Sequence, residues 1–130
     1  MMSEILLYVG SGAIIVWGIA HIVPTKSVVR GFGELSNDNR LIITMEWIAE
    51  GLTLCFIGAL VLVITIAAGT EGVASLYVFR GCAIMLIALA VLSLFTGAQT
   101  SVVPIKICPF VKGSVALLFF VASIIGGSGV

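Results

Sequence analysis

The sequence predicts an all-α protein, an integral membrane four-helix antiparallel bundle. Of its 130 residues, 61% are hydrophobic and only 9% are charged, and the mean hydropathy of +1.31 lies far outside the range of a soluble domain of this size. The apolar residues fall into four long runs separated by short polar connections. Because consecutive spans must cross the bilayer in opposite directions, the bundle is expected to be antiparallel.

The first span is predicted at residues 5–23 and ends at Pro24, which cannot continue a helix without losing a hydrogen bond. Gly10, Gly12 and Gly18 lie within it, and small residues allow helices to approach closely in lipid. No basic residues precede the apolar run, as they would in a signal peptide. We therefore expect this segment to be a retained helix.

A polar connection at residues 25–40 follows, and we expect an interfacial loop with about one helical turn. Gly31 and Gly33 weaken any regular helix there. Ser36 or Asn37 can cap the helix that comes next, since both side chains can accept a hydrogen bond from a free backbone N–H.

The second span, residues 41–68, carries two carboxylates near its start. Glu46 and Glu50 are four residues apart and lie on one face of a helix. Trp47 is a residue type that favours the membrane interface, and the run from Trp47 to Ala68 covers roughly 30 Å, one bilayer core. Because a carboxylate in hydrocarbon is costly unless it is paired or protonated, we expect any function to lie near these two residues.

The third and fourth spans are predicted at residues 73–98 and 107–126. The short turn at residues 69–72 makes the second and third spans antiparallel neighbours. The connection before the fourth span contains Pro104, and Lys112 is the one charge within that span.

The three cysteines are interpreted as small apolar packing residues. Cys55, Cys82 and Cys108 are predicted at depths that differ by roughly 10 Å or more, which is too far for a disulfide. The chain has no CxxC pair, so a quinone-linked dithiol site is disfavoured.

Orientation follows from the basic residues of the first and third connections, which are Lys26, Arg30, Arg40 and Lys106. By the positive-inside rule these connections are cytoplasmic and both termini are extracytoplasmic. We expect a multi-pass protein of the cell membrane. Arg80, near the outer face, is expected to snorkel or to meet Glu71.

One layer near the cytoplasmic face receives a polar group from every span. We predict these groups as binding residues of a site open to the cytoplasm: His21, Glu46, Glu50, Gln99 and Lys112. Glu50 and Lys112 lie at matched depth and are predicted to pair, and His21 is expected to face Glu46 or Glu50. The structural alternative is an interfacial Glu46, a His21 that only caps a helix end, and a Glu50–Lys112 ion pair without further role.

The compact layout and the first span, which leads through Trp17 and Gly18 into His21 and Pro24, resemble the DoxX-like group of small bacterial and archaeal membrane proteins. The resemblance implies a membrane subunit, because some relatives belong to quinone-reducing complexes, and it carries over no catalytic residue. Small multidrug transporters also have four helices, but their functional glutamate lies in the first span, where this chain has Glu4 only at the outer edge.

We therefore predict a binding or accessory subunit of a membrane complex, with a proton-coupled small-molecule carrier or channel component using Glu50 as the alternative. An enzyme is disfavoured because the spacing shows no nucleophile beside a base and no metal-ligand cluster, so no catalytic residue, metal or cofactor is predicted. The expected partners are the lipid bilayer and either other membrane subunits or further copies of the chain. A net charge of zero without a basic run argues against nucleic acid.

The topology can be tested by cysteine labelling in a background that lacks the native cysteines. Ser3→Cys and Ser128→Cys should react with an impermeant maleimide added outside intact cells, whereas Ser36→Cys should not. Labelling of Ser36→Cys alone would invert the orientation.

Overall fold

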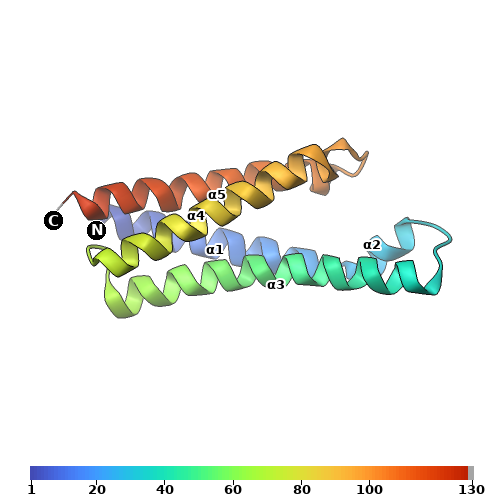
Figure 1. Cartoon of the computed structure of the whole chain (residues 1–130), viewed down its shortest axis with the longest axis horizontal. Helices are drawn as coiled ribbons and strands as arrows, with labels where there is room; N and C mark the ends of the chain where they lie inside the picture. The colour runs from blue at the N-terminus through green and yellow to red at the C-terminus, as the bar shows by residue number, and fades with distance from the viewer. Residues whose placement is uncertain (129–130) are drawn as a thin grey trace.

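A computed structural model describes residues 1–128 of the chain (Figure 1). Four helices are long and apolar enough to cross a membrane, and two short helices lie in the connections. Their bounds are α1 Met2–Ile22, α2 Thr25–Gly31, α3 Asn37–Ala68, α4 Val73–Phe95, the 3-10 helix η1 Gly97–Gln99 and α5 Val103–Gly127. Over the described residues there is no strand, and the prediction of an all-α four-helix membrane bundle is confirmed.

Consecutive long helices run in opposite directions, so the start of α1 and the end of α5 lie at the same end of the bundle (Figure 1). α1 packs most extensively against α3, α4 packs against α5, and α1 also lies along α5. α3 and α4 are joined by a short turn but contact each other far less, and in Figure 1 they diverge away from that turn.

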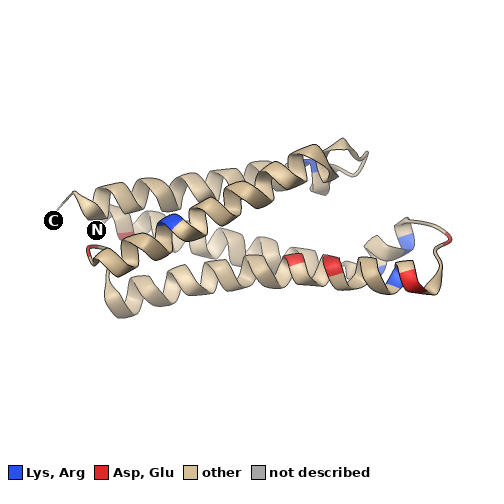
Figure 2. Cartoon of the chain, in the orientation of Figure 1, with Lys and Arg blue, Asp and Glu red and all other residues tan. Residues whose placement is uncertain are grey.

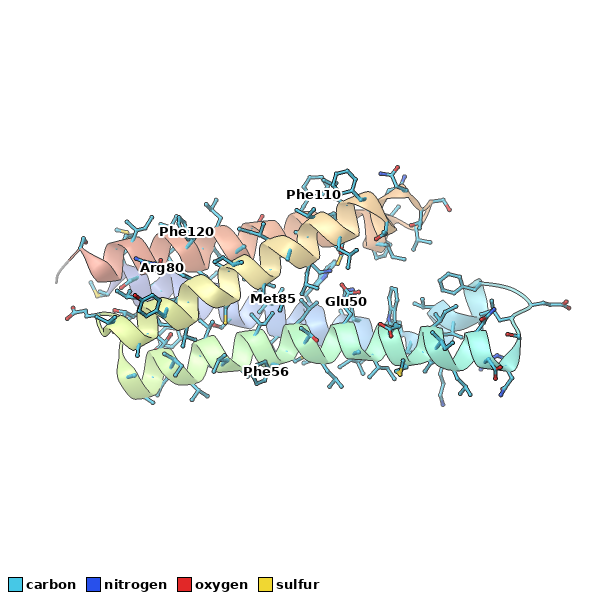
Figure 3. The ribbon with its side chains drawn as sticks, viewed as in Figure 1. Glu50, Phe56, Arg80, Met85, Phe110 and Phe120 are labelled. Carbon is cyan, nitrogen blue, oxygen red and sulfur yellow. The ribbon has the colours of Figure 1, made fainter. Side chains whose placement is uncertain are left out.

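The core consists of apolar side chains from all four long helices, while many large apolar side chains point outward. Buried members include Leu7, Ile14, Leu54, Val61, Phe79, Leu86 and Phe119. Outward-facing members include Phe56 on α3 and Phe110 on α5 (Figure 3), which are 66% and 68% exposed. An apolar surface of this extent is unfavourable in water and favourable against lipid, so the protein is a multi-pass membrane protein that contacts the bilayer.

Two helix ends follow local sequence signals. α1 ends at Ile22, just before Pro24, as predicted. The side chain of Ser36 caps α3 by accepting a hydrogen bond from the N–H of Asn39 at 3.2 Å. This bond satisfies one of the free N–H groups at the start of α3, which extends over 32 residues.

The first connection is more helical than the sequence predicted. α2 covers seven residues instead of about one turn, and its first residue, Thr25, donates a side-chain hydrogen bond to the carbonyl of Ile22 at 2.6 Å. The chain leaves this helix at Gly33, whose φ of 77° is a conformation that glycine adopts without strain.

The last connection also differs from the prediction. α5 begins at Val103 rather than at residue 107, because Pro104 lies in the first turn, where a helix needs no N–H donor. α4 ends at Phe95, and the residues that follow it form η1 instead of continuing the helix to residue 98.

Glycines bring α1 and α3 into close contact. A Cβ atom added at Gly18 would lie 2.7 Å from the carbonyl oxygen of Gly51, and one added at Gly58 would lie 2.9 Å from the carbonyl oxygen of Ser11. Backbone atoms cannot move aside as a flexible side chain can, so a side chain larger than hydrogen at either position would force α1 and α3 to shift apart. Close backbone approach of this kind is a main source of helix association in lipid.

Charged residues are distributed unevenly along the bundle (Figure 2). Most of the lysines and arginines lie at the end that carries α2 and the start of α5. At the other end Arg80 donates from Nε to the hydroxyl of Ser123 at 3.3 Å, and within residues 1–128 it forms no ion pair with Glu71. Ser3 is buried there and donates to Thr70 at 3.3 Å, so of the two residues chosen to test the predicted topology the exposed Ser128 is the more accessible to a labelling reagent.

The glycine contact makes a stability prediction for two residues of the same helix. Gly18→Ala should destabilise the protein by about 1–3 kcal/mol, because the added methyl group meets the α3 backbone. Gly12→Ala, which has no atom within 4 Å of the new Cβ, should be neutral or stabilising by up to about 1 kcal/mol through helix propensity. Thermal unfolding in detergent measures both, and equal losses would contradict the close contact.

Candidate functional site

A pocket of about 480 Å³ lies between the diverging ends of α3 and α4. Apolar side chains form most of its wall, among them Phe32, Ile42, Leu89, Leu92 and Ile105. Polar side chains from four helices reach it as well, among them His21, Glu46, Glu50, Ser93 and Cys108. An apolar cavity with a few converging polar groups is typical of a small-molecule site.

An ion pair lies at the inner side of this pocket. Lys112 of α5 is fully buried and donates from Nζ to Oε1 of Glu50 on α3 and to the hydroxyl of Ser93 on α4 at 2.7 Å. Figure 3 shows Glu50 directed from α3 into the space beside α4 and α5. Its side chain is still 30% exposed. The predicted pairing of Glu50 with Lys112 is confirmed.

His21 is held by tryptophans and a cysteine. Its Nδ1 lies 3.0 Å from the carbonyl oxygen of Trp17, and because a carbonyl only accepts hydrogen bonds, Nδ1 carries the proton. Nε2 faces Sγ of Cys108 at 3.6 Å. The indole N–H of Trp17 donates to the same sulfur at 3.4 Å. The ring of Trp47 stacks on the imidazole with centroids 5.3 Å apart.

Most of the predicted polar layer converges in the structure. A nitrogen of His21 and a carboxylate oxygen of Glu50 lie within 4.8 Å, so the ring faces that carboxylate, although its hydrogen bonds go to Trp17 and Cys108. Glu46 lines the pocket as an exposed side chain. Gln99 does not join the group, because it lies exposed in η1 and donates to the carbonyl of Leu94 at 3.2 Å.

Cys108 is the main residue that the sequence analysis missed. The prediction of a plain packing residue is wrong, because its sulfur contacts both His21 and Trp17. The predicted absence of a nucleophile beside a base and of a metal-ligand cluster is also wrong: ligand-type atoms of His21, Glu50 and Cys108 all lie within 4.8 Å of one another. These residues come from three helices, so no spacing along the chain reveals them. The sequence places residue 108 at the membrane face where His21 ends the first span, but depth alone does not show that the two side chains face each other.

Comparison with known proteins adds no assignment. No known family model, curated protein or solved structure matches the chain. The resemblance to the DoxX-like group stays a prediction.

The ion pair makes a double-mutant prediction. Glu50→Gln or Lys112→Met alone leaves a buried charge or its partners unsatisfied and should cost on the order of 3–5 kcal/mol, whereas the double variant should recover much of the loss. Thermal unfolding in detergent gives the coupling energy. Glu46→Gln is the matched control, because this exposed carboxylate has no ion-pair partner within residues 1–128 and its loss should cost little. Additive losses would contradict a direct Glu50–Lys112 interaction.

Proposed function

We propose that this membrane protein binds a small amphipathic molecule with a cationic head in the pocket between α3 and α4, as a binding or accessory subunit of a membrane complex. The observation that carries the proposal is the charge of the pocket wall. Glu46 and Glu50 are both accessible from the pocket, and none of the lysines or arginines that the structure describes lines it.

The charge balance favours a cation. Lys112 compensates Glu50 from the buried side, but it is itself fully enclosed. Glu46 has no such partner among the described residues, so the pocket retains about one negative charge. Trp47 lies on the same wall, and the face of an indole ring attracts a cation by about 0.5–2 kcal/mol.

The basic residues gather at a different place. A second pocket of about 360 Å³ between α2 and the start of α3 is lined by Lys26, Arg30 and Arg40, and within residues 1–128 no acidic residue lines it. Anions are therefore attracted to the rim formed by α2, while the acidic pocket is left to cations. If the basic connections are cytoplasmic, as the positive-inside rule predicts, both pockets open toward the cytoplasm.

Binding a ligand requires only a suitable pocket in this chain, whereas catalysis would also require groups that react with the ligand. The pocket is formed by one chain, and the large outward apolar surface offers contact to lipid and to further membrane subunits. The accessory role is thus consistent with a protein whose polar groups are concentrated in one pocket.

The second candidate function is a proton-coupled carrier or channel component that uses Glu50. It is favoured by the asymmetry of the bundle: all the residues lining the large pocket lie toward one end, and the other half is filled by core side chains such as Leu7, Ile14 and Phe79. This is the arrangement expected for a carrier open on one side only. In such a carrier, Glu50 would exchange a proton as the cation binds.

Binding can be tested in lipid nanodiscs with octyltrimethylammonium as the probe and octanoate as a probe of similar chain length and opposite charge. The cation should change the tryptophan fluorescence in a saturable way, and the anion should not. Glu46→Gln should weaken binding of the cation by about tenfold, which corresponds to about 1.4 kcal/mol. Lys26→Gln is the matched control, because it removes a charge of the other pocket and should not weaken it.

Equal responses to both probes, or equal effects of Glu46→Gln and Lys26→Gln, would contradict the proposed selectivity. Proteoliposomes distinguish the two candidate functions. A carrier should take up the cation in response to a pH gradient and lose uptake in Glu50→Gln, while a binding subunit should show saturable binding without uptake.

A further inference from the structure

We infer that His21, Glu50 and Cys108 form a binding site for a divalent transition-metal ion of the zinc type at the inner wall of the pocket. The inference does not depend on the proposed binding of an amphipathic cation. It rests on one ligand-type atom from each residue, all within 4.8 Å of one another. His21 and Cys108 are buried, and Glu50 is partly exposed. Imidazole, thiolate and carboxylate are the protein ligands that zinc takes.

The distance between two of these atoms already fits a tetrahedral ion. With bonds of about 2.3 Å to sulfur and about 2.0–2.1 Å to nitrogen, a tetrahedral angle separates the two ligand atoms by about 3.6 Å. Nε2 of His21 and Sγ of Cys108 are 3.6 Å apart. An ion could therefore bind between them without movement of α1 relative to α5.

Glu50 can complete a third position with a small movement. One of its oxygens lies within 4.8 Å of the other two atoms, and a tetrahedral zinc site needs about 3.3–3.7 Å between an oxygen ligand and a nitrogen or sulfur ligand. The carboxylate thus has to approach by about 1.5 Å at most. Its side chain is partly exposed toward the pocket, so the carboxylate has room to rotate.

The surroundings of the ligand atoms match those of metal sites. A histidine that binds a metal usually donates its other ring N–H to a backbone carbonyl or a carboxylate, which fixes the tautomer and the ring orientation. His21 does so through Nδ1 to the carbonyl of Trp17. The indole N–H of Trp17 points at the sulfur of Cys108, where it would stabilise the negative charge of a thiolate.

The charges and the coordination number determine what the site can do. Lys112 donates to one oxygen of Glu50, and a carboxylate has a second oxygen that can bind an ion after rotation of the group. On binding, the thiol of Cys108 loses its proton to water in the pocket, and the ion with one thiolate, one carboxylate and the Lys112 ammonium has a net charge of about +1. Three protein ligands leave a fourth position open toward the pocket, as in zinc sites that bind water or a substrate atom.

Cobalt(II) provides the direct test, because a cobalt ion bound to a thiolate gives a charge-transfer band in the near ultraviolet. Detergent-purified protein, titrated with cobalt(II) in the absence of amphipathic ligands, should show this band with one ion per chain, and zinc should displace it. Cys108→Ala should abolish the band. Cys55→Ala and Cys82→Ala are matched controls on the other two free cysteines and should retain it.

The carboxylate is tested in the same way. Glu50→Gln should weaken cobalt binding by at least tenfold, whereas Glu46→Gln, one turn away on the same helix, should leave it unchanged. Circular dichroism shows which variants are folded, and Cys108→Ser replaces Cys108→Ala if the latter is not. Folded protein without a thiolate band, or a band that survives Cys108→Ala, would overturn the metal site. The octyltrimethylammonium assay repeated in the presence of a chelator tests the proposed function separately.

Discussion

The buried ammonium group of Lys112 is the constraint on which this end of the bundle depends. A charge placed within a membrane span costs several kcal/mol unless it is paired, and Lys112 lies with no exposed surface on α5. Its two partners, Glu50 and Ser93, belong to α3 and α4, the two neighbouring long helices that contact each other least. One side chain thus joins three helices, and it does so beside the pocket that their divergence leaves.

The remaining helix is attached through the close contact of α1 with α3. Gly18 and Gly51 let the two backbones approach at the level of the site. This proximity allows the indole N–H of Trp47 to donate to the carbonyl of His21 at 2.6 Å, which satisfies one of the carbonyls left free where α1 ends. The close packing of α1 against α3 thus also places the ring of Trp47 where it stacks on the imidazole of His21.

The sequence predicted features that depend on local signals or on depth, and it missed those that depend on rotation about a helix axis. The proline that follows α1 and the Ser36 cap act within a few residues of themselves. The Glu50–Lys112 pair could be inferred because both residues lie about one turn inside the same membrane face. Depth alone could not show that Cys108 faces His21, nor that Gln99 would lie outside the polar group, because both depend on which direction a side chain leaves its helix or connection.

The length of α3 ties the site to the membrane itself. At about 1.5 Å per residue its 32 residues extend about 48 Å, well beyond a hydrocarbon layer of about 30 Å, while the 23 residues of α4 extend only about 35 Å. The excess can be absorbed by tilt or by projection into the headgroup region. The immersion of Glu50 and of the pocket mouth then varies with the hydrophobic thickness of the surrounding lipid. A thicker membrane would submerge the acidic groups and a thinner one would hydrate them, so lipid composition becomes a physical control on the ion pair.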